Sequence, residues 1–450
     1  MLKIKLLGFT LSLGKDQSGA DGEIDEGQKA SFLRKKRLIL IIVAIIVIFF
    51  IIGSVLHRDS DNASNPSENN GFYNSQKGTS GLSPAVAAGK QLSNNQCEGE
   101  GVPYKLTRSP MDPEDFSMVV PYGLLAGEHV TPIDHQYFSP KDFNSPLDAY
   151  EVYAMGDATI VEVEEREGNR NGKTIPNFRL VFSITCTYFY YYDLVTSLTP
   201  DIKKEYEAAR KGVFKRPVAI KVKEGQLIGR IGGQTLDFAV WDTTKRLTGF
   251  VVPEHYNPEP WKIYTADPLN YYSDELKKFI LSRYVRTVEP ISGKIDYDID
   301  GKLIGNWFLE GTNNYAGGKE FTNWQYWKGH FAVVPDHIDP TGVFVSFGDF
   351  NGEAIQFFIQ DLYIRPENVD TNTGVVRYEL GQHTYQKENG GFWDNNSVAQ
   401  GIKIVPARES QKHCVLLQLI ETRKLKMEYF PNTKCSANFN FTPNAKFYLR

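Results

Sequence analysis

The sequence predicts a mainly β protein in which a single N-terminal transmembrane helix precedes two β-rich exterior domains of the sandwich or barrel type with few helices. Three observations indicate this fold class. Residues 38–56 form an uncharged apolar run. About 350 residues lie beyond a polar stretch that follows it, about twice what one hydrophobic core usually serves. The chain also has 24 Tyr and 28 Phe, and its apolar residues often alternate with polar ones, which favours strands.

Residues 38–56 (LILIIVAIIVIFFIIGSVL) have the length and composition of a membrane-spanning helix. At about 1.5 Å per residue they cover roughly 28 Å, close to the hydrocarbon thickness of a bilayer. The basic residues 34–37 (RKKR) precede the run, so residues 1–37 are expected in the cytoplasm and the C-terminal domains on the exterior face. A cleaved signal peptide and a buried core helix are the alternatives, but the run is long for a signal peptide and no small-residue cleavage site follows it.

Residues 57–96 are expected to form a flexible polar linker. Ser, Asn, Gly, Asp and Gln dominate them, so they bury too little apolar surface to offset the entropy of ordering. As a coil of about 40 residues, the linker would place the folded part roughly 35 Å from the bilayer on average.

The first exterior domain is expected over residues 97–288. A helix is predicted after Thr199 and Pro200, and a second helix is predicted after Ser273 and before the boundary at Glu289 and Pro290. The rest alternates short strand-like runs with turn residues. The clearest of these runs are residues 158–164, 178–184 and 218–222.

The second exterior domain is expected over residues 291–450, again as a β-sandwich or barrel. Its apolar runs are short, and turn residues separate them. The predicted strands cover residues 343–347, 354–359, 374–380, 414–420, 424–429 and 445–450.

All four cysteines follow the predicted membrane segment and so lie on the side where disulfides persist. None belongs to a C-x-x-C metal pair. Cys414 and Cys435 lie in neighbouring strand-like runs and form a possible disulfide, with two buried thiols as the alternative. Cys97 and Cys186 are a weaker candidate pair, because they lie far apart in the sequence and their spacing does not indicate whether they are bonded.

Residues 222–240 (VKEGQLIGRIGGQTLDFAV) contain the motif that resembles a known family. They are similar to the Gly-Gln-x-Ile-Gly-x-x-Gly hairpin and following His-x-His strand of the lysostaphin-type, or LytM-like, zinc metallopeptidases. Phe238 and Val240 match the core positions of that strand, whereas Thr235 and Asp237 replace its two histidines.

Three further segments resemble the same family in the same order, so the likeness covers about residues 118–245. Residues 151–163 are similar to its V-x-A-x-x-x-G-x-V hairpin, with Ala158 in place of Gly. Residues 127–137 stand where its first ligand motif, His-x3-Asp, would be, but the spacing fails from both His129 and His135. Residues 191–194 (YYDL) resemble its Tyr-x-His-Leu motif, with Asp193 replacing the histidine.

An unbroken family motif would imply a zinc ion held by two His and one Asp, with a bound water attacking a peptide bond. Here an irregular zinc site is conceivable because carboxylates also bind zinc. The alternative is that Asp134 and His135 hydrogen-bond their loop while Asp237 faces solvent or caps a turn. The candidate metal ligands are His129, Asp134, His135, Asp193 and Asp237.

A calcium loop is a second candidate site, because Asp296, Asp298 and Asp300 precede Gly301 in a D-x-D-x-D-G pattern. Trp307 stands where the bidentate Glu of such a loop is required. A strand that runs into a hairpin turn at Asp300 explains the same residues without an ion.

Aromatic residues cluster between residues 307 and 327, with Asn residues among them. Such side chains stack on sugar rings or fill a partner's pocket, but in β domains they more often pack in the core. His330 and His337 flank an apolar run at a spacing that fits no metal motif, and we assign them no role. The aromatic residues are Trp307, Tyr315, Trp324, Tyr326 and Trp327.

These features lead to three hypotheses. The first is a membrane-anchored exterior protein whose metallopeptidase-like domain is not catalytic and acts in cell-envelope binding or scaffolding, with no cofactor expected. The second is an active zinc metallopeptidase or envelope hydrolase with an altered ligand set, and the third is a purely structural or adhesion module. The expected partners are the membrane, through residues 38–56, and an envelope polymer or protein ligand. The net charge of -4, with no basic block beyond residues 34–37, excludes nucleic acid as a partner.

Overall fold

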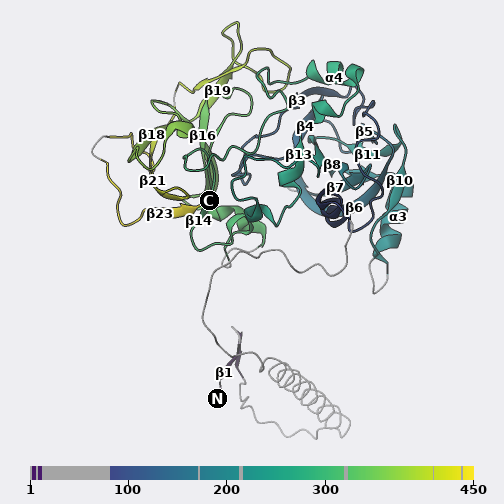
Figure 1. Ribbon diagram of the computed structural model, residues 1–450, viewed down its shortest axis with the longest axis horizontal. Helices are drawn as coiled ribbons and strands as arrows, with labels where there is room; N and C mark the ends of the chain where they lie inside the picture. The colour runs from purple at the N-terminus through teal and green to yellow at the C-terminus, as the bar shows by residue number, and fades with distance from the viewer. Residues whose placement is uncertain are drawn as a thin grey trace, which may run out of the picture. The chain divides into compact units, whose positions relative to one another are not determined.

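β-Sheet dominates the computed structural model of the chain, which confirms the mainly β part of the predicted fold class (Figure 1). The structure describes residues 3–6, 9–12, 82–170, 173–211, 216–318, 323–408, 410–436 and 439–450. Residues 1–76 and 77–450 are two separate units. In the first, β1 (Lys3–Leu6) pairs antiparallel with β2 (Phe9–Ser12). All further elements belong to the second.

The predicted membrane helix, residues 38–56, lies outside the described residues, so the membrane anchor stays a prediction. Among the helices of the described ranges, none is both long and apolar enough to cross a bilayer.

The end of the predicted linker differs from the expectation, because residues 84–92 form helix α2 (Pro84–Leu92). Ser83 caps it by accepting a hydrogen bond from the Val86 backbone N–H, and Pro84 starts it at a position that needs no N–H donor. A Cβ on Gly89 would lie 1.5 Å from the Cys186 carbonyl oxygen, so only glycine permits this contact. The neighbouring Cys97 is bonded to Cys186, so α2 is attached to the first sheet.

The first sheet runs in the order β10-β6-β7-β8-β12-β4-β3, and β13 (Thr265–Ala266) pairs with β12. Side chains alternate between its two faces, as in any strand. On β8 and β12, for example, Tyr192 and Phe238 belong to the larger hydrophobic cluster, whereas Tyr191 and Trp241 belong to a second cluster on the other face. The strands are β3 (Phe116–Val120), β4 (Gln136–Pro140), β6 (Ala158–Arg170), β7 (Lys173–Ser183), β8 (Tyr188–Val195), β10 (Ile220–Val222) and β12 (Leu236–Asp242).

The glycine motif forms part of a smaller sheet of order β5-β11-β9, made of β5 (Tyr150–Tyr153), β11 (Leu227–Ile231) and β9 (Ser197–Leu198). A Cβ on Gly229 would lie 2.2 Å from the Ser197 carbonyl oxygen, which is why this position of the motif requires glycine. The two predicted helices are α3 (Pro200–Arg210) and α4 (Asp274–Leu281). Ser273 caps α4, but the Thr199 side chain makes no capping hydrogen bond to α3.

The C-terminal strands close into a barrel of order β14-β15-β16-β17-β18-β21-β22-β23, and β19 (His383–Gln386) pairs with β20 (Lys403–Pro406) outside it. Cys414 of β21 is bonded to Cys435. Each run predicted as a strand in this half overlaps a barrel strand. The barrel strands are β14 (Gly305–Leu309), β15 (His330–Pro335), β16 (Val343–Phe350), β17 (Glu353–Ile359), β18 (Val376–Gly381), β21 (His413–Glu421), β22 (Lys424–Phe430) and β23 (Lys446–Leu449).

The first sheet and the barrel share a hydrophobic cluster, in which Trp241 of β12 and Phe250 occur together with Phe308 of β14 and Tyr315. The short helices η1 (Pro253–Tyr256), η2 (Lys262–Tyr264), η4 (Asn314–Ala316) and η5 (Asn323–Gly329) connect the two at this cluster. The remaining short helices are η3 (Pro268–Asn270) and η6 (Pro366–Asn368). Two independent domains with a boundary at residues 289–290 stay a prediction.

The segment that resembles a calcium loop does not fit an ion, because its carboxylates turn to different partners. Asp296 accepts hydrogen bonds from the Gly249 backbone N–H (2.8 Å) and Lys294 Nζ (2.6 Å), and the exposed Asp300 pairs with Arg423. Asp298 accepts from the Asn306 N–H (2.7 Å) and lies 3.7 Å from Arg450 Nε. Residues 295–299 also belong to no sheet, so the predicted hairpin strand is wrong, although a turn follows at residues 300–301.

Arg450 is the buried partner of this segment. Its guanidinium donates to the backbone carbonyls of Ile299 (3.0 Å), Lys302 (3.0 Å), Ile304 and Asn306 (3.1 Å). Its Cζ atom lies 3.9 Å from the centre of the buried Trp307 ring. The Arg450 side chain therefore donates to the backbone carbonyls of the segment that leads into β14.

We expect Arg450→Ala to lower the free energy of unfolding by about 3 kcal/mol, because it leaves the buried Asp298 carboxylate without its neighbouring cation and several buried carbonyls without a donor. Urea unfolding followed by circular dichroism measures the change. Arg423→Ala is the control, because its side chain is 47% exposed and it removes only a surface pair with Asp300. Equal losses in the two variants would contradict this role of Arg450.

Candidate functional site

The five candidate metal ligands lie together at one pocket of about 290 Å³ on the face of the first sheet that meets the barrel. Strand register explains the proximity, because Asp237 of β12 lies directly opposite Asp193 of β8 on one side and Tyr137 of β4 on the other. His135 immediately precedes β4. The sheet pairing therefore brings together residues that are separated by up to about 100 positions in the sequence.

His135 lies between two carboxylates. Its Nδ1 atom is 3.4 Å from Asp134 Oδ1, and its Nε2 atom is buried 3.2 Å from Asp237 Oδ2, close enough for an ion pair but not aligned for a hydrogen bond. Thr235 donates a hydrogen bond to the other oxygen of Asp237 (3.1 Å). The exposed His129 ring lies at the rim, 6.0 Å from the His135 ring between centres. Both ring nitrogens of His135 thus face carboxylate oxygens.

Lys262 provides a buried positive charge in the same pocket, with a side chain only 7% exposed. Its Nζ atom is 3.2 Å from Asp134 Oδ1 and 3.1 Å from Glu259 Oε2. Tyr315, from the barrel half, donates to Glu259 (2.9 Å), and Trp261 donates to Asp134 through Nε1 (2.8 Å). These contacts connect the barrel half to the ligand positions of the sheet.

Two arginines complete the pocket. Arg166 of β6 forms an ion pair with Asp193. Arg179 of β7 stacks on aromatic rings, with its Cζ atom 4.3 Å from the centre of Trp261 and 5.0 Å from that of Tyr191. The pocket lining therefore contains two arginines in addition to Lys262 and His135.

The ion pairs shift the titration of the buried groups. Burial alone would lower the pKa of His135, but Asp237 and Asp134 outweigh it and raise the pKa to about 9. Burial likewise opposes the charge of Lys262, but Asp134 and Glu259 hold its pKa above the usual value. Burial raises the pKa of Asp193 although Arg166 acts against it. His135 and Lys262 are both cationic at neutral pH.

The pocket does not fit the zinc ion that the family resemblance implies. Zinc needs deprotonated ligands with free lone pairs. Here Asp134, Asp237 and Asp193 each lie beside a protein cation, respectively Lys262, His135 and Arg166. Within the described ranges, no three His, Cys, Asp or Glu side chains are placed to hold a metal ion.

Sequence reasoning did not identify the cations of the pocket. Arg166 follows the predicted strand 158–164 and Arg179 lies in the predicted strand 178–184, and charged residues at such positions are equally typical of a solvated sheet face. Lys262 and Glu259 of the same loop belong to no sequence motif, and only the folded loop places Lys262 beside Asp134. The aromatic residues predicted between 307 and 327 pack mainly in the interior, since Trp307, Tyr315 and Trp327 are buried, but Tyr315 and Tyr326 also line the pocket.

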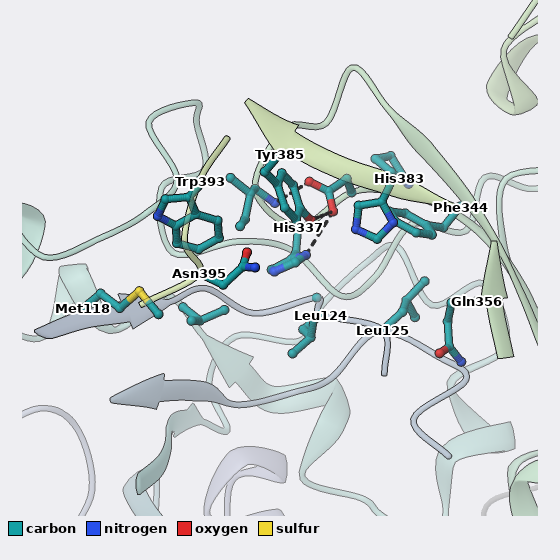
Figure 2. Close-up of a pocket in the computed structure, with 15 residues that line it drawn as sticks. Met118, Leu124, Leu125, His337, Phe344, Gln356, His383, Tyr385, Trp393 and Asn395 are labelled. Atoms are coloured by element: carbon teal, nitrogen blue, oxygen red, sulfur yellow. Dashed lines mark hydrogen bonds and ion pairs between the residues drawn. The ribbon is translucent and has the colours of Figure 1, made fainter. Parts of the chain in front are cut away.

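A second pocket, of about 330 Å³, lies between the β3 region and the barrel. Figure 2 shows Trp393, Tyr385 and Phe344 on one side of it and Met118, Leu124 and Leu125 on the other. Asp336 at its edge faces His337 Nδ1 (3.1 Å) and accepts hydrogen bonds from the Tyr385 hydroxyl and the backbone N–H groups of Ile338 and Asp339. None of the candidate ligands lies in this largely apolar pocket, so it is not the site that the sequence predicted.

We expect the His135 imidazole to titrate near pH 9 in the folded protein. Because this value lies above the unfolded value of about 6.5, His135 contributes full stability below about pH 6.5 and loses it as the pH rises through 9. Histidine NMR resonances give the midpoint, and His135→Gln identifies the signal.

Urea unfolding at pH 7 and pH 9.5 tests the same point. The fall in stability over this interval should be smaller in His135→Gln than in the wild type. His383→Gln, in the second pocket, is the control and should keep the wild-type fall. A His135 midpoint at or below 6.5 would contradict the ion pairs with Asp134 and Asp237.

Comparison with known proteins gives limited similarity. No protein-family model and no curated protein matches this chain. Among solved structures, Helicobacter pylori Csd3 is similar in its hexagonal crystal form, with 14% identity and a TM-score of 0.22 over 38% of this chain and 34% of that one. The orthorhombic form gives 14% identity and a TM-score of 0.21 over 39% and 40%. The similarity spans well under half of Csd3.

Proposed function

We propose that this chain is a membrane-anchored exterior protein whose metallopeptidase-like domain binds a cell-envelope polymer or peptide without cleaving it. One observation supports this most directly. At the candidate metal site, the carboxylates Asp134, Asp193 and Asp237 are each paired with a protein cation. A bound metal would have to displace these cations from a largely buried site.

The residues that would perform hydrolysis are also replaced. Thr235 and Asp193 stand at the positions of the two catalytic histidines that the resemblance implies. Thr235 bonds Asp237, and Asp193 pairs with Arg166, so neither side chain is a free base. An attacking water would lack both the metal and the general base that lower its pKa and accept its proton.

The pocket retains features of a binding site. Trp261 and Tyr326 are partly buried, and with Tyr191 and Tyr315 they supply aromatic surface. Arg166 and Glu259, whose side chains are 40% and 26% exposed, lie on its solvent side. Aromatic walls with a few charged groups are typical of sites that bind a ligand segment without transforming it.

The alternative is an active zinc hydrolase with an altered ligand set. It is favoured by the location of His129, Asp134, His135, Asp193 and Asp237 around a single pocket. Metal binding would then require that Lys262 and Arg166 swing away from their carboxylates.

Metal analysis of the purified full chain in detergent separates the two functions. We expect less than about 0.1 zinc per chain by inductively coupled plasma mass spectrometry after incubation with zinc and gel filtration, because the ligand positions are already paired. About one zinc per chain, lost in a His135→Ala, Asp237→Ala double variant but kept in an Asp300→Ala control, would favour the hydrolase.

Co-sedimentation with insoluble cell-wall peptidoglycan tests the binding role. We expect the full chain to sediment with the polymer and to release no soluble fragments. Tyr326→Ala with Trp261→Ala should weaken sedimentation, whereas Trp393→Ala in the second pocket should not. Failure of the wild type to sediment would refute polymer binding and favour a structural or adhesion module.

A further inference from the structure

The second pocket contains a buried histidine with one ring nitrogen unpaired. The side chain of His337 is 8% exposed, and its Nδ1 atom lies 3.1 Å from Asp336 Oδ1. No hydrogen-bond partner of its Nε2 atom is found among the described residues. Figure 2 shows the His337 ring in the space between Leu124 and Tyr385. A polar atom in such surroundings is usually satisfied by a ligand or by water.

Asp336 holds the His337 ring in one orientation. Its Oδ1 atom also accepts from the Tyr385 hydroxyl (2.7 Å), and its Oδ2 atom accepts from the backbone N–H groups of Ile338 (3.0 Å) and Asp339 (2.7 Å). Burial alone would raise the pKa of Asp336, but His337 and these donors hold it below its ordinary value. An ionised carboxylate only accepts, so Nδ1 donates to it, and in the neutral imidazole the lone pair is on Nε2. The pocket therefore offers a hydrogen-bond acceptor.

Four rings line one side of the pocket, and neighbouring rings meet nearly at right angles. The His383 ring lies between those of Phe344 and Tyr385, with interplanar angles of 88° and 82°. The Tyr385 ring in turn meets Trp393 at 83°. Rings arranged in this way present both positive edges and negative faces, which an aromatic guest matches better than an aliphatic one.

The polar groups of the lining favour a neutral ligand. Among the described residues that line the pocket, Asp336 is the one charged side chain apart from the histidines, and its oxygens already accept four hydrogen bonds. An anion would meet this buried negative charge without a lysine or arginine to offset it. The Gln356 amide is bonded to both backbone groups of Gly127 (2.9 Å each), and His383 and Asn395 are more exposed than His337.

We propose that the second pocket binds a small neutral aromatic molecule whose N–H or O–H group donates to His337 Nε2. Indole and phenol are the simplest members of this class. The pocket of about 330 Å³ is at the low end of the range for ligand sites, and its walls come from three parts of the chain, so a small molecule fits better than a partner's segment. No residue of this pocket lines the pocket of the candidate metal ligands, so this inference is independent of the proposed function.

Isothermal titration calorimetry with indole and benzofuran tests the inference on the full chain in lipid nanodiscs, with empty nanodiscs as the blank. Benzofuran has the shape of indole, but an oxygen acceptor replaces the N–H donor. At about pH 8, where an ordinary histidine is neutral, we expect indole to bind at least about tenfold more tightly, because benzofuran leaves Nε2 without a donor. Benzoate should bind more weakly than indole.

Three variants locate the binding. His337→Phe keeps a ring but removes the acceptor, so indole and benzofuran should bind about equally. His255→Phe is the matched control and should keep the preference for indole, because its ring lies against Phe308 and does not line the pocket. Leu125→Trp fills the pocket and leaves His337 and Asp336 unchanged, so it should abolish the binding of both probes. Circular dichroism confirms that each variant is folded.

Several outcomes would overturn the aromatic-ligand site. They are equal binding of indole and benzofuran by the wild type, no binding of either, tighter binding of benzoate than of indole, and an unchanged preference in a folded His337→Phe variant. Retained indole binding by a folded Leu125→Trp variant would also overturn it, which decides the matter if His337→Phe does not fold. Tighter binding of N-acetyl-tryptophanamide than of indole would overturn the free small molecule in favour of a partner protein's side chain.

Discussion

The buried ion network around Asp134 is the constraint on which the arrangement of the site depends. Asp134 accepts from Trp261 and lies beside both His135 and Lys262, so one carboxylate joins the start of β4 to the loop that crosses the sheet. Charges removed from water are tolerated only when each has partners close by. The loss of any single member would remove a partner from its neighbours, so the network links the loop, the strand and the pocket.

The same network connects the sheet to the barrel. Glu259 binds Lys262 on one side and the Tyr315 hydroxyl on the other, and Tyr315 belongs to the segment between β14 and β15. Its ring also packs with Tyr256, Phe308 and His330 in the cluster that both halves share. The barrel thus contributes a wall of the pocket, and the pocket can be assembled only when both halves are folded together.

The charges of the pocket are balanced by the side chains of the chain itself. A structural or catalytic cation balances carboxylates in a site of low dielectric. In this pocket Lys262, Arg166 and the imidazolium of His135 supply that positive charge from the chain itself. Gly229 is required by the close approach of the Ser197 backbone and not by the chemistry of the pocket.

The sequence by itself determined the strand-rich fold class, helices such as α3 and α4, and the segments that hold the candidate ligands, because these follow from local periodicity, capping and turn residues. It did not indicate α2, which contacts the Cys186 backbone through Gly89 and is followed by the bond from Cys97 to Cys186. Only the tertiary structure decided that Asp298 faces Arg450 and that Lys262 faces Asp134, across about 150 and 130 residues. The physical reason is that charge pairing depends on distance in space, and neither periodicity nor spacing along the chain records which distant side chains the fold brings within a few ångströms.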